Sequence, residues 1–166
     1  MKITVMEYSS IWLQMFEEEK NQLELILPDS SVVEHIGSTA VPGLVAKPVI
    51  DIMIGLKDFS VADSLISSVE ALTYEYVSHW ESEMPYRRFF RKEKAGVRTR
   101  HIHMVATGTE FWHRHLFFRD YLRTHPDIAE DYANLKRNLA NQEWQDMNDY
   151  AGAKTDFIQS IEAKAL

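Results

Sequence analysis

Apolar residues in the first part of the chain recur first at helical spacing and then in short runs. The periodicity over residues 10–27 predicts an amphipathic helix, and Ser9 or Ser10 is its candidate N-cap. The runs at residues 32–37 and 48–54 predict two short strands, each ended by a glycine. A second helix is predicted to open at Asp58 or Ser60 and to end near Leu72.

The rest of the chain changes from strand-like to helical character after Gly108. Three short segments rich in aromatic and branched residues predict strands at 73–77, 86–91 and 100–106. The polar link 92–96 predicts a hairpin loop between the last two. Helical periodicity then predicts helices at 111–122, 128–139 and 148–165.

This order predicts an α+β fold with a mixed sheet flanked by helices and a helical C-terminal third. We expect one domain over residues 1–166, with an α/β core at about 1–107 and a helical part at about 108–166.

Composition narrows the class of protein. With 45% hydrophobic and 26% charged residues, the chain has the balance of an ordinary soluble domain. The absence of cysteine excludes disulfides and thiolate metal sites, and it fits a reducing compartment. The N-terminal residues lack the apolar core of a secretion signal, and no window is apolar enough to span a membrane. We therefore expect a cytoplasmic protein without a membrane partner.

The net charge of −7 restricts the ligands that we expect. General nucleic-acid binding depends on many lysines and arginines that neutralise phosphates, so an acidic chain argues against it. A nucleotide or another small phosphorylated ligand needs only a few local cations and remains compatible with this charge. The sequence leaves the oligomeric state open.

The stretch EHIGSTAVPGLVAKPVIDIMIG, residues 34–55, holds the first candidate site. Gly37 and Ser38 end a predicted strand, where backbone N–H groups and a hydroxyl can approach a phosphate closely. Asp51 lies in the next strand and could hold a divalent cation against that phosphate. The alternative is that the glycines only punctuate turns and Asp51 is a strand-edge carboxylate. Its place in an otherwise apolar run favours the site, because an unpaired carboxylate there is costly.

The same stretch resembles the signature of the nucleotidyltransferase fold, which is Gly-Ser followed, after a loop, by Asp-x-Asp on the next strand. In this alignment Asp51 takes the place of the second acid, and Val49 takes the place of the first. Valine cannot bind a metal, so the chain departs from the signature at the position that carries chemistry.

Two histidines in the segment RTRHIHMVA are candidates for the missing ligands. His101 and His103 lie two residues apart, so on a strand both rings point to one face. With Asp51 they would form a set of two histidines and one carboxylate, which suits Zn, Mn or Fe better than Mg. His35, just before the Gly-Ser turn, is a further candidate ligand. We expect a divalent metal (Mg, Mn or Zn); the alternative is that both histidines only hydrogen-bond to neighbours or to phosphate oxygens.

Several cations could complete a phosphate site. Lys47 and Arg87 lie on or beside the predicted strands, and Arg119 and Arg123 lie four residues apart on one face of a predicted helix. The simpler interpretation of the two helical arginines is intrahelical pairing on a solvated face. Lys136 and Lys154 of the helical third could also neutralise a phosphate. The simpler interpretation of Lys136 is that it only covers the ring of Tyr132, which lies one turn earlier.

Three segments together resemble the GrpB family of small bacterial proteins, a domain also found fused to dephospho-CoA kinase. They are EHIGSTAVPGLVAKPVIDIMI, RHIHMV and HLFFRDYLRTHPDIAEDYANLKRNLA, and DYAGAKTDFIQSIEAKA fits the family's C-terminal helix. The resemblance covers most of the chain and implies a nucleotidyltransferase-like α+β fold. It does not imply a settled activity, because a fold does not fix a function.

Three hypotheses about function follow. The first is a metal-dependent nucleotidyl- or phosphoryl-transferase in which Asp51 and Ser38 are catalytic, Gly37 and Ser38 hold phosphate, and the histidines complete the metal site. The second is a degenerate transferase that binds a nucleotide or a CoA-type ligand, which Val49 favours. The third is a protein-folding accessory that uses its helical face, and only the fused relatives motivate it.

Overall fold

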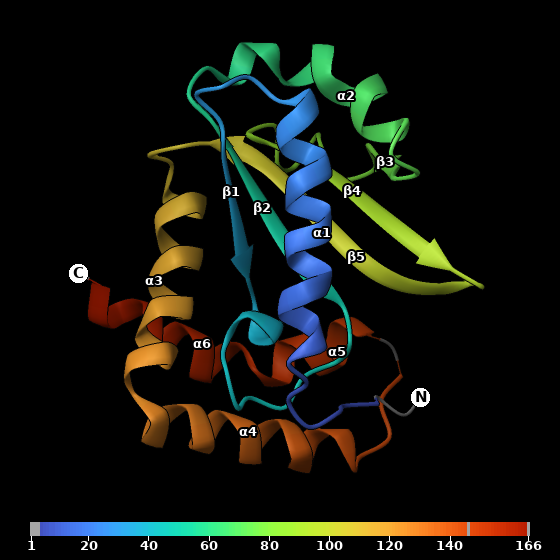
Figure 1. Ribbon diagram of the computed structural model, residues 1–166. Coiled ribbons are helices and arrows are strands. Elements are labelled where there is room, and N and C mark those ends of the chain that lie inside the picture. Colours follow the sequence, from blue (N-terminus) through green and yellow to red (C-terminus); the bar gives the residue numbers. More distant parts are fainter. Residues whose placement is uncertain (1–3, 146, 166) are drawn as a thin grey trace.

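The computed structural model describes residues 4–145 and 147–165, which form one five-stranded sheet with helices around it (Figure 1). The strands are β1 (Val32–Ile36), β2 (Ile50–Leu56), β3 (Glu75–Val77), β4 (Arg87–Lys94) and β5 (Val97–Ala106). The α-helices are α1 (Ile11–Ile26), α2 (Ala62–Glu70), α3 (Glu110–Thr124), α4 (Pro126–Ala140), α5 (Met147–Ala153) and α6 (Thr155–Glu162). Short 3₁₀ turns lie at η1 (Ser38–Ala40), η2 (Phe59–Val61) and η3 (Ala163–Ala165).

The sheet is mixed and has the strand order β1-β2-β5-β4-β3. Only β2 and β5 run parallel, and the other neighbouring pairs are antiparallel. A parallel pair needs a crossover, and here the chain between β2 and β5 supplies α2, β3 and β4. Because β2 and β5 are central neighbours, residues far apart in the sequence lie side by side on them.

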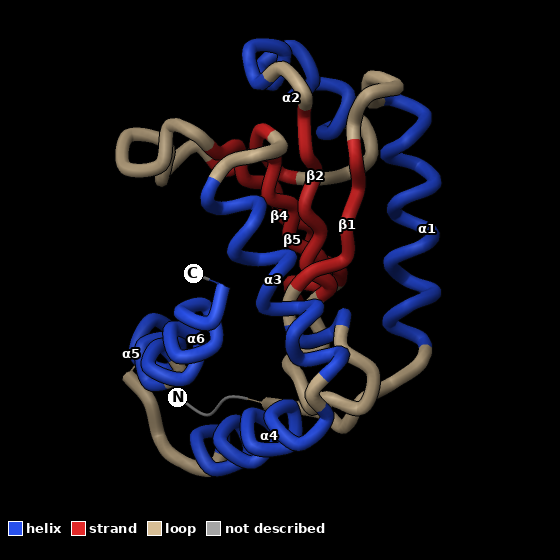
Figure 2. Tube along the Cα trace, turned by 90° about the vertical axis from the view of Figure 1, so that its left-hand side faces the viewer, coloured by secondary structure: helices blue, strands red, loops and turns tan. Residues whose placement is uncertain are grey.

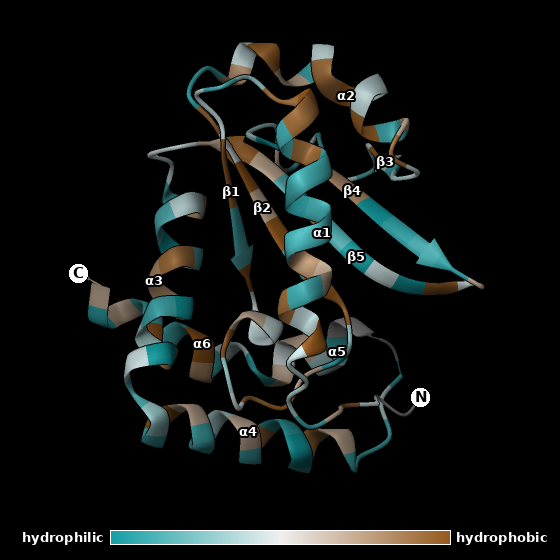
Figure 3. Cartoon of the chain, in the orientation of Figure 1, coloured by the Kyte–Doolittle hydropathy of each residue, from teal (hydrophilic) through white to brown (hydrophobic). Residues whose placement is uncertain are grey.

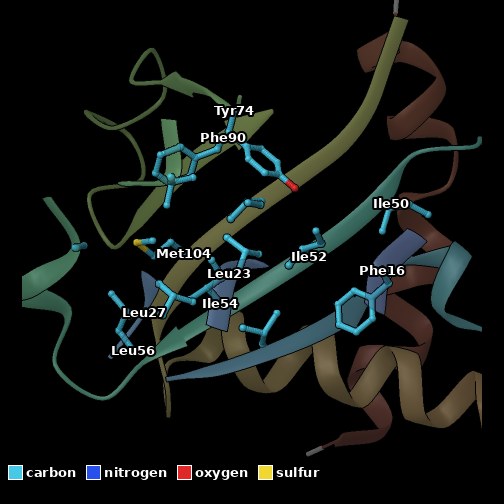
Figure 4. Close-up of a cluster of buried hydrophobic side chains, with 14 of the residues drawn as sticks. Phe16, Leu23, Leu27, Ile50, Ile52, Ile54, Leu56, Tyr74, Phe90 and Met104 are labelled. Carbon is cyan, nitrogen blue, oxygen red and sulfur yellow. The ribbon is translucent and has the colours of Figure 1, made fainter. Parts of the chain in front are cut away.

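The main core lies between α1 and one face of the sheet (Figure 4). The apolar stripe of α1 meets alternate residues of the central strands, whose side chains point to the same face. Phe16 and Leu23 of the helix are packed with Ile52, Ile102 and Phe90 of the sheet. Each of these sheet residues is fully buried, so this layer fixes the register of β2 and β5.

The opposite face of the sheet is covered by α3, and Figure 2 shows α1 and α3 on opposite sides of the strands. Phe111 and Trp112 of α3 are packed on Met53 and Val105. Helix α4 packs on the loop between β1 and β2 through a second buried cluster, which includes Val45. β2 is hydrophobic along much of its length, whereas the hairpin end of β4 is hydrophilic (Figure 3).

Most of the predicted elements are confirmed, including the α+β class and the mixed sheet. The single helix predicted at 148–165 is wrong, because the chain leaves α-helix at Lys154 and forms α5, α6 and η3. The predicted hairpin loop is also shorter than 92–96. Ala95 and Gly96 both have positive φ, which is typical of a tight hairpin turn, so the strands extend to Lys94 and Val97. In the described part of the chain, no helix is both long and apolar enough to span a membrane.

Candidate functional site

The predicted Gly-Ser turn lies directly against the predicted acid. β1 ends at Ile36, which pairs with Asp51 of β2, and Gly37 then turns the chain into η1 with φ +75°. A Cβ atom added to Gly37 would lie 2.8 Å from Asp51 Oδ2. Glycine is therefore required here twice, for its positive φ and for the close approach of the carboxylate.

Both histidines of β5 lie beside the same carboxylate. The parallel register pairs Asp51 with His101, and the distances from Asp51 Oδ1 are 3.5 Å to His101 Nδ1 and 3.8 Å to His103 Nε2. Burial alone would raise the pKa of the Asp51 carboxyl, but the imidazoles of His101 and His103 beside it outweigh burial and lower the pKa. Asp51 is therefore ionised at neutral pH, with two imidazoles next to its carboxylate.

Arg87 of β4 contacts His103 at the ring nitrogen that does not face Asp51. Its Nη1 donates to His103 Nδ1 at 3.1 Å, and its guanidinium lies 4.9 Å from the centre of the Phe89 ring. Burial lowers the pKa of His103, which favours the neutral ring. Since Nδ1 accepts from arginine, we assign the ring proton to Nε2, which faces Asp51. Arg87 thus orients His103, and it is not among the residues that line the pocket beside Asp51.

Asp51 and the Gly-Ser turn form part of a small pocket of about 100 Å³. The residues around it come from the loop between β1 and β2, from both central strands, and from the C-terminal helices. They are Ser38, Thr39, Ala46, Lys47, Val49, Asp51, His101, Lys136, Tyr150 and Lys154. Three lysines and one aspartate thus surround one small space, so the pocket carries an excess of positive charge.

Lys136 of α4 is the least exposed of these cations, at 2%. Its Nζ donates to the carbonyl oxygen of Val45 at 2.8 Å and lies 5.2 Å from the centre of the Tyr132 ring. Among the described residues, no carboxylate forms an ion pair with it. Burial, together with repulsion from Lys154 and Lys47, lowers the pKa of Lys136 to about 6. A buried ammonium without an anionic partner is unfavourable, which makes this lysine the most informative residue of the pocket.

The other two lysines share this environment. Lys154 follows α5, and its Nζ lies 4.7 Å from the centre of the Tyr150 ring. Burial and then repulsion from Lys47 lower the pKa of Lys154 to about 8. Burial also lowers the pKa of Lys47, and Asp51 opposes that shift. All three amines are therefore easier to deprotonate than a lysine in water, mainly because they are buried.

The two predicted helical arginines lie away from the pocket lining. Arg119 Nη1 lies 2.6 Å from Glu34 Oε2 and also donates to the carbonyl oxygen of His35, while its Nε donates to Asp120 at 2.9 Å. Arg123 Nε donates to the carbonyl oxygen of Ala40 at 2.9 Å. Both side chains thus hold α3 against β1 and the Gly-Ser turn.

His35 is not brought to the other histidines. Ile36 pairs with Asp51, so the alternation of the strand directs His35 to the opposite face, where it is stacked on Phe16 of α1 at 4.6 Å. Its Nε2 hydrogen-bonds to Thr39 Oγ1 at 2.9 Å, and burial lowers its pKa to about 4. His35 therefore stabilises the Gly-Ser turn from the face of the sheet that packs against α1.

The donors near Asp51 do not form a ready metal site among the described residues. No group of three or more His, Asp or Glu side chains in the described part of the chain is arranged to hold one ion. Asp51 instead contacts both imidazoles itself, and the neighbouring lysines would repel a cation. We therefore assign no chemical step to a metal, and metal binding stays a prediction.

The sequence alone did not place the C-terminal helices at this pocket. One signal was available for Lys136, which lies four residues after Tyr132 and three before Leu139, on the buried stripe of α4. Nothing comparable marked Tyr150. A larger hollow of about 640 Å³, beside α3 and α6, is lined by none of the predicted site residues.

A comparison with solved structures supports the fold class. The chain matches the Cid1 poly(U) polymerase, solved with MgGTP bound, with a TM-score of 0.54, over 82% of this chain and 45% of that one. At 12% identity this likeness concerns the fold alone, and it places the chain among proteins of the nucleotidyltransferase fold.

The particular family follows from the sequence. The model of the family "GrpB protein" matches residues 2–164, so the chain belongs to the GrpB family, as predicted. The crystal structure of GrpB from Enterococcus faecalis is 39% identical, with a TM-score of 0.87, and the match covers 98% of this chain and 96% of that one.

Two curated relatives extend the comparison. The UPF0157 protein YqkA of Bacillus subtilis is 37% identical over 99% of this chain, and the chain spans about half (47%) of that relative's length. A dephospho-CoA kinase of Mycolicibacterium paratuberculosis is 26% identical over 80% of this chain and 38% of its own length. The predicted association of this domain with dephospho-CoA kinase is thus confirmed by a relative.

Proposed function

We propose that the pocket binds the phosphate of a nucleotide or of another small phosphorylated ligand, and that its lysines supply the opposing charge. The observation that carries this proposal is Lys136, a buried lysine with no carboxylate partner in the described chain, in the same pocket lining as Lys154 and Lys47. A bound phosphate would provide an anionic partner for Lys136. Ser38 and the η1 backbone would add neutral donors to it.

The position of Val49 supports recognition rather than two-metal catalysis. It lines the pocket where the nucleotidyltransferase signature has its first acid, so among the described residues Asp51 is the one carboxylate in the lining. A two-metal mechanism places carboxylates around both ions, and this pocket offers lysines in their place. We therefore favour a phosphate-binding site on a transferase fold that needs no metal for binding.

A second candidate function is metal-dependent transfer of a nucleotidyl or phosphoryl group. The observation that favours it is the position of His101 and His103 beside Asp51 on adjacent strands. In that case a metal would hold the phosphate through this set, and binding would depend on the ion.

A thermal-shift experiment separates the two functions. Metal-stripped protein is mixed with ATP, GTP, AMP or CoA, either with EDTA or with Mg²⁺, Mn²⁺ or Zn²⁺. The favoured function predicts stabilisation in EDTA, of about 2.7 kcal/mol at a ligand concentration of a hundred times Kd. The shift should disappear in Lys154→Met and persist in Lys94→Met, a change at an exposed lysine of the β4–β5 hairpin.

Two other results have a clear meaning. Stabilisation that requires a metal and is lost in Asp51→Asn supports the second function. If no phosphorylated ligand raises the melting temperature under any condition, both functions fail, and a protein partner becomes the next hypothesis.

A further inference from the structure

Lys136 is surrounded by charged and titratable groups from every element that packs against the pocket. Lys154 follows α5, Lys47 precedes β2, and Asp51 is the one acid among the described residues that line the pocket. The other titratable neighbours in the described chain are the phenols of Tyr132 and Tyr150 and the imidazole of His101. Two histidines already contact Asp51, and no carboxylate of the described residues forms an ion pair with Lys136 or with Lys154.

Two adjacent amines without a described carboxylate partner, Lys136 and Lys154, favour a ligand with two negative charges over a ligand with one. The attraction between a lysine and a phosphate a few Å apart scales with the charge of each, and burial strengthens it. The pKa of Lys136, lowered to about 6, leaves this amine largely neutral at pH 7 in the free protein. A nearby dianion would raise that pKa and would make Lys136 take up a proton on binding.

The size of the pocket restricts the ligand further. Its volume of about 100 Å³ is well below the roughly 300–1,000 Å³ of pockets that enclose a whole small molecule. It can hold one phosphate group and not the nucleoside attached to it. Such a space favours a terminal phosphate, because a monoester has to place one substituent at the mouth of the pocket and a diester has to place two.

We propose that this pocket is specific for a terminal phosphate monoester in its dianionic form, and that Lys136 determines the specificity. The inference rests on the proposed function and goes beyond it, since it names the chemical class of the phosphate. Free phosphate and the end of a nucleoside monophosphate share this chemistry.

The test compares methyl phosphate with dimethyl phosphate at pH 7.5, where the monoester is largely a dianion and the diester is a monoanion. Binding is followed by ³¹P NMR titration with EDTA present and at constant ionic strength. We expect the wild-type Kd for methyl phosphate to be lower than that for dimethyl phosphate by about tenfold or more. In Lys136→Met the difference should fall below about threefold, and Lys94→Met should behave as wild type.

A second readout separates specificity from loss of structure. Calorimetry of methyl phosphate binding in two buffers of different ionisation enthalpy should detect net proton uptake in the wild type and none in Lys136→Met. If that variant does not fold, Lys154→Met provides the same comparison, because it removes a charge from the same pocket.

Each failure has a different consequence. Equal affinity for the two esters overturns this inference and leaves the proposed function standing. If neither ester binds, and the nucleotides of the thermal-shift experiment do not bind either, the proposed function fails as well.

Discussion

At the scale of single residues, the close packing of Gly37 against Asp51 fixes the position of the Gly-Ser turn beside the pocket. Gly37 has a backbone conformation that favours glycine, and the Asp51 carboxylate occupies the space of a Cβ atom. The turn and the acid therefore depend on each other, although 14 positions separate them in the sequence.

Gly37→Ala should consequently cost more than an alanine at another glycine of positive φ. Gly96 is the matched control, because its φ is +79° and nothing lies within 4 Å of its added Cβ. We expect Gly96→Ala to lose about 1 kcal/mol of unfolding free energy, and Gly37→Ala to lose at least about 2. Urea denaturation measures both losses, and equal losses would contradict the assigned contact.

Lys136 leads to a prediction about pH. In the unfolded chain its pKa is near 10.4, and in the folded chain burial lowers it to about 6, so between these values the unfolded state binds more protons. Its contribution to stability therefore rises with pH across this window. Lys136→Met should stabilise the free protein at pH 7, and its advantage should shrink by about 1–3 kcal/mol by pH 9. Melting curves over this range measure the effect.

A stability difference that stays constant from pH 7 to 9 would mean that Lys136 is charged in the folded protein throughout. It would also remove the proton uptake expected on ligand binding. Lys94→Met should show little difference from wild type at either pH, because Lys94 is exposed.

At the scale of elements, α3 is held to the sheet by arginines that the sequence offered as phosphate ligands. Arg119 is 8% exposed and pairs with Glu34 of β1, so its guanidinium is part of the helix–strand contact. Arg123 hydrogen-bonds to the backbone at Ala40, at the end of the Gly-Ser turn. These contacts position the turn indirectly, through the helix.

Arg119→Met should therefore destabilise the protein by about 2–3 kcal/mol, because it leaves Glu34 and a backbone carbonyl without their partner. Arg114→Met is the control on the same helix. Arg114 is more exposed, and one of its partners, Glu110, lies almost entirely in solvent, so a loss below about 1 kcal/mol is expected. Similar losses in chemical denaturation would mean that the Arg119 contact contributes no more than a surface pair.

The sequence predicted most elements because the apolar residues of each follow a clear helical or strand pattern. The spacing of His101 and His103 also placed both rings on one face, beside Asp51, as the register now confirms. His35 was harder to place, because only the pairing of Ile36 with Asp51 determines which face it takes. The contribution of Lys136 and Lys154 depends on how the C-terminal helices pack against the β1–β2 loop, which local periodicity does not encode.

At the scale of the whole molecule, the pocket joins the sheet to the helical C-terminal third. β2 and β5 supply Asp51 and His101, whereas α4 and the junction of α5 with α6 supply Lys136 and Lys154. A ligand at this place would connect segments that otherwise contact each other mainly through apolar clusters.

This arrangement predicts coupled protection from hydrogen exchange. A saturating phosphorylated ligand should slow exchange in residues 37–47 together with residues 130–140 and 149–155, because these segments contribute lining residues. Exchange in α2, which contributes no lining residue, should change little. Protection of residues 37–47 alone, or of the two C-terminal segments alone, would contradict a pocket shared between them.

The most direct test is a crystal structure of the protein grown with a nucleoside monophosphate in the presence of EDTA. The account predicts that the phosphate lies in the pocket beside Ser38, with the amines of Lys136 and Lys154 within hydrogen-bonding distance of its oxygens. A phosphate bound elsewhere on the surface, with the lysine pocket unchanged, would contradict the account.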